Sequence, residues 1–240
     1  MKATIEFNSK TYHWNTDEGI DLSIPVSPQG PSAYGIPNAK FSTYVDGGFI
    51  GNVNQGGSCN VNDILINPHG NGSHTECVGH ISKEPVSINK TLKQELLIAE
   101  LISVTATEII EPELLNLHHL EAGCNALIIR TLPNSTDKKQ RNWYGTNPPY
   151  LSVNAMKHLN ENGIEHLLVD LPSVDAETDG KLVGHHAFFG YPENKNSKKT
   201  ITELIYIPDS VADGVYLLNL QVAPIENDAA PCKPIIYQLR

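Results

Sequence analysis

Two nearly unbroken apolar stretches constrain the fold of this chain most strongly. They cover residues 96–104 and 126–130, and runs of this kind are typical of parallel strands that are buried on both faces. A third strand is expected at 164–171. Before it, residues 152–162 have the spacing of an amphipathic helix, with Ser152 as N-cap and Gly163 after the last turn. Strand, helix and strand in this order imply a crossover connection and parallel pairing.

The remaining pattern adds short elements around this unit. We expect a hairpin over 3–14, short strands at 20–25, 41–50 and 61–66, a helix at 112–120, and closing strands at 215–224 and 235–239. The Pro/Gly/Ser-rich segment 25–39 predicts a long loop, and loops of that length often line binding sites. The sequence therefore predicts one α/β domain over residues 1–240, with a mixed β-sheet and few helices.

Composition excludes several classes of function. The chain has 240 residues, 40% of them hydrophobic, and a formal net charge of −10. This charge argues against nucleic acid as a partner, because no basic stripe could neutralise phosphates. No apolar run is long enough to span a bilayer, and the N-terminus lacks the apolar core of a signal peptide. The four cysteines lack CxxC spacing, which argues against a disulfide framework or a thiolate zinc site and favours a reducing cytoplasm.

A histidine-rich stretch at 67–80 is the strongest functional signal. It holds His69, His74 and His80, with Glu76 between the last two and glycines among them. Imidazole and carboxylate together form the ligand sets of zinc, manganese and iron(II) sites. His74 and Glu76 are two residues apart, so on an extended segment they point to the same side. The alternative is a solvated polar turn with incidental histidines. Cys77, within the same stretch, is interpreted as a buried spacer.

One loop alone would leave a metal with too few ligands, so distant partners are needed. His185 and Glu203 are the two candidates. Glu203 is a lone acid in an apolar setting, which predicts either a solvent-facing side chain or a ligand-binding one. For His118 and His119, in the expected helix, roles at the surface or the helix end are favoured over metal ligation.

In their order along the chain, these motifs resemble the cyclase family of metal-dependent hydrolases, which includes the bacterial kynurenine formamidases. The family signature runs His-x-Gly-Thr-His-x-Asp-x-Pro-x-His and is followed far downstream by Asp-x-Pro-Ser-x-Asp, a His and a Glu. Residues 72–80 match the second half of the first motif, and Asp170, Pro172, Ser173 and Asp175 match the second. His185 and Glu203 then fall at the positions of the late ligands. The resemblance covers nearly the whole chain.

The chain departs from the family pattern at three positions. His69 lies five residues before His74, whereas the family spacing is four. Either the loop 70–72 bulges and His69 still reaches the metal, or this ligand is lost. Glu76 stands where the family has Asp, which moves the carboxylate outward by one methylene, and Val78 stands where the family has Pro.

The resemblance implies a fold, a site and an assembly. The expected fold is the swivelling β/β/α fold of the cyclase family, and the expected assembly is a homodimer. The expected cofactor is a divalent metal, zinc or else manganese, with one or two ions per chain. Its implied ligands are His69, His74, Glu76, His185 and Glu203. A bound dication lowers the pKa of a water ligand towards roughly 7. His80 is the expected general acid/base, and the alternative is a fourth histidine ligand or a residue that supports the ligands.

Three functions remain open at this point. The first is an arylformamidase-like hydrolysis of a small-molecule amide such as N-formylkynurenine, by a metal-bound hydroxide. The second is ring opening of a cyclic amide, as in an isatin hydrolase. The third is a metal-binding or ligand-binding protein that has lost catalysis, which the shifted His69 and the altered Glu76 suggest. The loop 25–39, Trp143 and Tyr144 are candidates for apolar walls around an aromatic substrate, with core packing as the alternative for Trp143.

Overall fold

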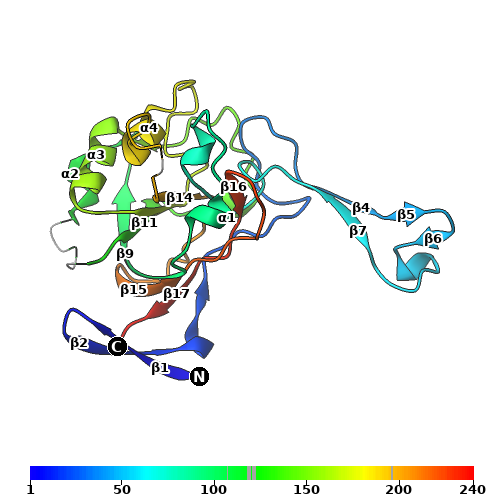
Figure 1. Ribbon diagram of the computed structural model, residues 1–240, viewed down its shortest axis with the longest axis horizontal. Helices are drawn as coiled ribbons and strands as arrows, with labels where there is room; N and C mark the ends of the chain where they lie inside the picture. The colour runs from blue at the N-terminus through cyan, green and yellow to red at the C-terminus, as the bar shows by residue number, and fades with distance from the viewer. Residues whose placement is uncertain (107, 118–119, 121–122, 196) are drawn as a thin grey trace.

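A nine-stranded mixed β-sheet forms the body of the protein (Figure 1). The computed structural model describes residues 1–106, 108–117, 120, 123–195 and 197–240. The strand order is β16-β8-β14-β13-β11-β9-β15-β17-β3. The bounds are β3 (Ile20–Asp21), β8 (His74–Glu76), β9 (Leu96–Thr105), β11 (Ala126–Leu132), β13 (His166–Val169), β14 (Thr200–Glu203), β15 (Gly214–Asn219), β16 (Ala229–Pro231) and β17 (Ile235–Gln238).

The predicted strand–helix–strand unit is confirmed at the centre of this sheet. Strands β14, β13, β11 and β9 are mutually parallel, and the flanking strands are antiparallel to their neighbours. Helix α3 (Val153–Glu161) connects β11 to β13, and the Ser152 side chain caps it by accepting the Ala155 N–H at 3.0 Å. The apolar runs are continuous because both faces of these strands are covered.

Side chains of β11 show how the two faces are filled. Leu127 and Ile129 pack with helix α3 and with α4 (Val183–Phe189), whereas Ala126 and Ile128 join a second cluster on the opposite face. All four are fully buried. Full burial of one large aliphatic side chain contributes about 1.5–3 kcal/mol, so the central strands form a rigid base for the loops at their ends.

Shorter elements surround the sheet. They are β1 (Lys2–Phe7), β2 (Lys10–Asn15), β10 (Ile109–Ile110), β12 (Tyr150–Leu151), α1 (Ile88–Thr91), α2 (Pro112–Leu115) and the 3₁₀ turns η1 (Thr16–Glu18), η2 (Val53–Gln55), η3 (Val78–His80) and η5 (Thr136–Lys139). Strands β1 and β2 form the predicted N-terminal hairpin, which docks through the Trp14 and Tyr237 rings at 4.8 Å.

The helix expected at 112–120 is shorter than predicted. It ends at Leu115 because Asn116 adopts a left-handed conformation with φ 36°. His118 and His119 lie outside the described residues. Among the described residues, no helix has the length and apolar character that crossing a membrane requires.

A hairpin arm, residues 40–65, projects far from the body (Figure 1). It consists of β4 (Lys40–Thr43), β5 (Val45–Asp46), β6 (Phe49–Ile50) and β7 (Asn62–Leu65), with β4 paired to β7 and β5 to β6. The expectation of one continuous strand at 41–50 is therefore wrong. The return strand β7 leads directly into the histidine-rich stretch, so the root of the arm borders the candidate site.

Candidate metal centre

Three candidate ligands are placed by the pairing of β8 with β14. His74 lies directly opposite Glu203, and Glu76 lies two residues further along β8. Because side chains two apart on a strand share a face, all three project to the same side. His74 Nε2 is 3.3 Å from Glu203 Oε2, and all three residues are at most 3% exposed. Glu203 is thus a site residue, and the solvent-facing alternative does not apply.

The loop before β8 brings His69 into the same cluster. His69 Nδ1 is 3.2 Å from Glu76 Oε2, and ligating atoms of His69, His74 and Glu76 all lie within 4.8 Å of one another. The extra residue is absorbed by a turn in which Asn71 N–H donates to the Asn67 carbonyl at 3.1 Å, followed by Gly72 with φ 85°. A Cβ at Gly72 would lie 2.8 Å from the Ile24 carbonyl oxygen, so the position favours glycine.

His185 reaches the cluster from the first turn of α4. Asp175 accepts the backbone N–H groups of Gly184 and His185 and lies 2.5 Å from His185 Nδ1. This arrangement leaves His185 Nε2 directed at the site, 2.9 Å from Glu76 Oε1. A carboxylate behind a ligating imidazole fixes its tautomer and orientation. The family-like Asp175 therefore acts on the site through His185.

His80 and Asp228 complete the cluster on its more open side. His80 Nδ1 is 3.4 Å from Asp228 Oδ2, and its Nε2 is 3.8 Å from Glu76 Oε2. Asp228 also lies 2.8 Å from His69 Nε2. The His80 side chain is 25% exposed, compared with 2% for His185. The His80 ring is therefore more accessible than the ring of His185.

A buried ion pair anchors the segment that carries Asp175. Lys138 Nζ donates to Asp170 Oδ2 at 2.8 Å, and Asp170 also accepts the N–H and the hydroxyl of Thr131. Asp170 and Lys138 are 1% and 4% exposed. Asp170 thus ties the end of β13 to the end of β11, which fixes where the following loop starts.

The ionisable side chains of the site strongly shift one another's pKa values. Burial would lower the pKa of His69, but its hydrogen bond to Asp228 and the neighbouring Glu76 raise it to about 10. Burial likewise opposes a charged His185, yet the Glu76 charge and the Asp175 hydrogen bond raise its pKa well above the usual range. Glu76 is the counterpart: burial favours its neutral form, but the charges of His185 and His80 hold its pKa well below normal. The carboxylates therefore need buried positive charge beside them.

The same residues fit a divalent metal. Within the described part of the chain, His74 Nε2, His185 Nε2 and both oxygens of Glu76 are buried without a hydrogen-bond partner, although they approach one another as nitrogen–oxygen contacts. Buried polar atoms are normally paired. Imidazole nitrogens and carboxylate oxygens aimed at a common point are the donor set of zinc and manganese. A second group, Glu76, His80 and His185, shares Glu76 with the first.

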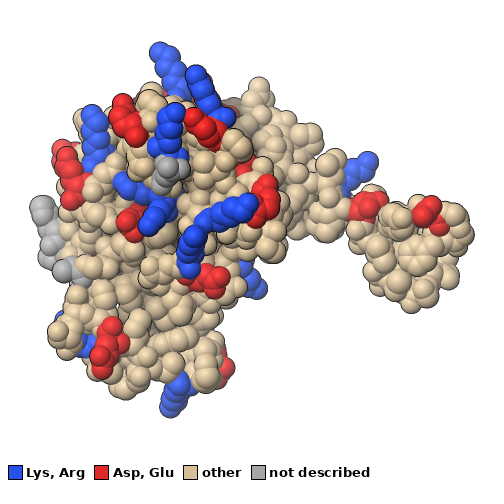
Figure 2. All heavy atoms as spheres, viewed as in Figure 1, with Lys and Arg blue, Asp and Glu red and all other residues tan. Residues whose placement is uncertain are grey.

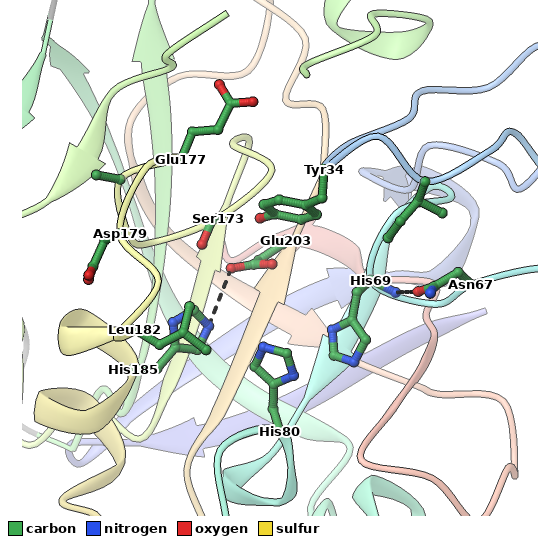
Figure 3. Close-up of a pocket in the computed structure, with 12 residues that line it drawn as sticks. Tyr34, Asn67, His69, His80, Ser173, Glu177, Asp179, Leu182, His185 and Glu203 are labelled. Atoms are coloured by element: carbon green, nitrogen blue, oxygen red, sulfur yellow. Dashed lines mark hydrogen bonds and ion pairs between the residues drawn. The ribbon is translucent and has the colours of Figure 1, made fainter. Parts of the chain in front are cut away.

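A cavity of about 370 Å³ opens above the histidines. Figure 3 shows His69, His80 and His185 on its floor, with the Tyr34 ring beside Glu203. Tyr34 donates to the Pro172 carbonyl at 2.5 Å, which holds the loop 25–39 over the site. The lining comprises Tyr34, Ile36, Asn67, His69, His80, Ser173, Ala176, Glu177, Asp179, Leu182, His185 and Glu203. Its size is within the usual range for small-molecule sites.

The structure thus brings all six sequence-predicted site residues into one cluster, and four of them, His69, His80, His185 and Glu203, line the cavity. From the loop 25–39, Tyr34 and Ile36 line the cavity, as the sequence predicts. Trp143 instead packs in the core with Ala33 and Leu204. Cys77 is buried, with its thiol directed at the Val86 carbonyl, in agreement with a spacer role. Reasoning from sequence missed Asp228 as a member of the site. Only its place in a motif-like ending, Asp228-x-x-Pro231, could have indicated it.

Known proteins resemble this chain in sequence and in fold. A kynurenine formamidase of Bacillus thuringiensis (strain Al Hakam) is 29% identical over 223 residues, which cover 92% of this chain and 98% of that protein. A predicted metal-dependent hydrolase from Bacillus stearothermophilus has a similar fold, with a TM-score of 0.64, 15% identity, and coverage of 91% and 97%. An isatin hydrolase bound to thioisatinate has a TM-score of 0.67, 14% identity, and coverage of 93% of each chain.

The family model described as "Putative cyclase" matches residues 20–176. This match spans more than half of the chain and includes the histidine-rich stretch and the Asp170–Asp175 motif. The expected fold class, α/β with a mixed sheet and few helices, is confirmed by the described strands and helices and by the solved structures of similar fold. This chain therefore belongs to the cyclase family.

Proposed function

We propose that this protein is a metal-dependent hydrolase that cleaves the carbon–nitrogen bond of a small aryl amide, in the manner of an arylformamidase. One observation carries the proposal: buried, unpartnered nitrogen and oxygen atoms of His74, Glu76 and His185 lie beneath a cavity of about 370 Å³. The sequence likeness to kynurenine formamidases supports N-formylkynurenine or a relative as substrate.

In this proposal the metal is held by His69, His74, Glu76, His185 and Glu203. Glu76 would offer both carboxylate oxygens to the site, because its Oε2 faces His69 and its Oε1 faces His185. A bound dication would activate water and polarise the amide carbonyl. Zinc is the first choice for this donor set and manganese the second. Asp175 keeps the His185 imidazole oriented, and Tyr34 and Ile36 exclude water from one side of the amide.

His80 is the proposed general acid/base. It faces the cavity, and its two ring nitrogens lie beside Asp228 and Glu76. An imidazole placed in this way can accept a proton from the attacking water and return it to the leaving amine. The Asp228 carboxylate, 3.4 Å from His80 Nδ1, orients the ring for both transfers.

A cyclic aryl amide is the second candidate substrate, as in an isatin hydrolase. The favouring observation is the lining of the cavity, which among the described residues contains no lysine or arginine. An amino acid carboxylate would therefore find no side-chain cation there. The third alternative, a metal binder without catalysis, loses its main support because His69 lies within the ligand cluster.

The proposed function is tested with metal-free protein reloaded with zinc or manganese. We expect hydrolysis of formanilides or of isatin by the reloaded protein and none by the verified metal-free protein. Elemental analysis gives the number of ions per chain, which we expect to be one or two. Turnover in the metal-free protein, or none with any amide after reloading, would contradict the proposal.

We further propose a homodimer in which the arm, residues 40–65, contacts a second copy. Its exposed apolar side chains include Val45 at 61%, Val53 at 51% and Ile64 at 59%. Two-stranded hairpins are only marginally stable in water, and exposed apolar patches usually mark contact surfaces.

The distribution of charge supports a second copy as the partner. The arm carries only three charged residues, Lys40, Asp46 and Asp63, in a chain of net charge −10 (Figure 2). Two copies with this net charge repel each other least through such a surface. We also propose the reducing cytoplasm as the compartment, because the four cysteines lack CxxC spacing.

A further inference from the structure

The metal cavity has an acidic rim that the proposed hydrolysis does not use. Among its lining residues, Glu177 and Asp179 lie apart from the metal cluster and are partly exposed. Figure 3 shows both carboxylates outside the group formed by His69, His80 and His185. Both residues therefore line a part of the cavity away from the three histidines.

Backbone contacts hold both rim carboxylates in place. Glu177 accepts the N–H groups of Gly145 and Asn147 at 2.6 and 2.9 Å. Asp179 accepts the N–H groups of Lys181 and Val183 at 2.9 and 3.1 Å. These donors carry no net charge, so the two negative charges remain while their positions are fixed. Neither carboxylate is among the described ion pairs between side chains.

The floor of the cavity identifies it as a ligand site independently of the rim. His185 is 1% exposed and lines the cavity with an Nε2 atom that has no hydrogen-bond partner. The carboxylates of Glu76, Glu203 and Asp228 lie close to the histidines, where one or two dications would offset them. The rim charges are further out and would stay uncompensated. Among the described residues, no lysine or arginine lines the cavity to balance them.

Resting on the proposed function, we propose that Glu177 and Asp179 select substrates by charge. The site accepts aryl amides that are uncharged or carry an ammonium group near the ring, and it disfavours those that carry a carboxylate there. A carboxylate within about 6–8 Å of a fixed negative charge, in surroundings between protein and water in polarity, is disfavoured by about tenfold. This charge preference ranks neutral cyclic amides and amine-bearing formamides above carboxylate-bearing amides as substrates.

The test uses three formanilides that differ only in one ring substituent: aminoethyl, ethyl or carboxyethyl. With zinc-loaded protein, we expect kcat/KM for the aminoethyl compound to exceed that for the carboxyethyl compound by about tenfold, mainly through KM. In the Glu177→Gln/Asp179→Asn variant, this ratio should fall to about one. Each substitution keeps one oxygen that can accept one of the two backbone N–H groups, and its NH₂ group replaces the oxygen that accepts the other. The matched control is Glu161→Gln, an exposed acid at the end of α3.

Binding provides a readout that does not depend on turnover. The three corresponding anilines, which are the product amines, are titrated by calorimetry into wild type and variants. The dissociation constants should follow the same order, and the difference should shrink as salt is raised from about 0.05 to about 0.5 M, because exposed charges are screened. The salt series also covers the case in which the double variant is too unstable to assay.

The outcomes separate this proposal from the proposed function. Equal or reversed preference for the charged compounds, or a ratio unchanged in the double variant, would overturn the selection by the rim. Absence of turnover with all three amides would count against the hydrolase assignment, while the aniline titrations would still decide the charge preference.

Discussion

Asp175 and His185 are in direct contact behind the candidate metal centre, with Asp175 Oδ2 2.5 Å from His185 Nδ1. The same carboxylate accepts the N–H groups of Gly184 and His185, so it holds both the ring and the first turn of α4. A Cβ added at Gly184 would lie 2.7 Å from Asp175 Oδ1. The pair therefore couples the position of a helix to the geometry of a proposed metal ligand.

Asp175→Asn should lower metal affinity by about 10- to 100-fold, because loss of a carboxylate behind a ligating histidine typically has that effect. The fold should persist, since the asparagine oxygen can still accept a backbone N–H. Zinc binding is measured by competition with a chromophoric chelator. The exposed Glu161→Gln serves as control. Unchanged affinity would mean that His185 is not a ligand.

His80→Ala should keep its metal and lose activity by about 10²-fold or more, as expected when a general acid/base is removed. His69→Ala should instead lower the metal content per chain, because His69 lies within ligand distance of His74 and Glu76. Both are measured by elemental analysis after exhaustive dialysis, beside turnover. Metal loss in His80→Ala would make His80 a ligand, and full occupancy in His69→Ala would remove His69 from the ligand set.

Lys138→Met should destabilise the protein by about 3–5 kcal/mol, because it leaves the buried Asp170 carboxylate without its cation. Chemical denaturation of the metal-free protein gives the free energy of unfolding. Lys195→Met is the matched control: its ion pair with Glu84 is exposed, so its midpoint should stay close to that of wild type. Equal effects of the two substitutions would contradict the structural role assigned to the buried pair.

His166 should make stability depend on pH. Burial lowers its pKa to about 4, with Glu165 opposing the shift. The unfolded chain binds this proton near pH 6.5, so stability should fall by about 3 kcal/mol as pH drops from 6.5 to 4. In His166→Gln this part of the loss should be missing. Metal-free proteins are compared at about pH 7 and pH 4.5, with the exposed His13→Gln as control; a loss of the same size in His166→Gln would contradict the assignment.

Val45→Asp combined with Ile64→Asp should convert a dimer into a monomer, because both side chains are more than half exposed on the arm. Light scattering at micromolar concentration should give about twice the 26.3 kDa chain mass for wild type and the chain mass for the variant. The control Ile225→Asp alters an exposed apolar residue outside the arm. A monomeric wild type would refute the dimer.

Features of this protein that depend on local pattern could be predicted from the amino-acid sequence. The apolar runs at 96–104 and 126–130 predicted central parallel strands, since continuous hydrophobicity requires cover on both faces. The two-residue spacing of His74 and Glu76 predicted that they share a face, because strand side chains alternate. The family resemblance added His185 and Glu203, which local pattern alone left undecided.

Contacts that depend on how the strands are ordered in space could not be predicted from local pattern and are seen in the folded protein. Asp228 meets His69 although 159 residues separate them, and no periodicity in either segment encodes that approach. The sequence predicts ordinary strands for the arm, because the alternation of apolar and polar residues shows which face of a strand can be buried. It does not show whether another part of the protein covers that face. The acidic rim likewise depends on the fold. The loop that carries Glu177 and Asp179 is held between the buried Asp170 anchor and α4, and this brings both carboxylates to the cavity.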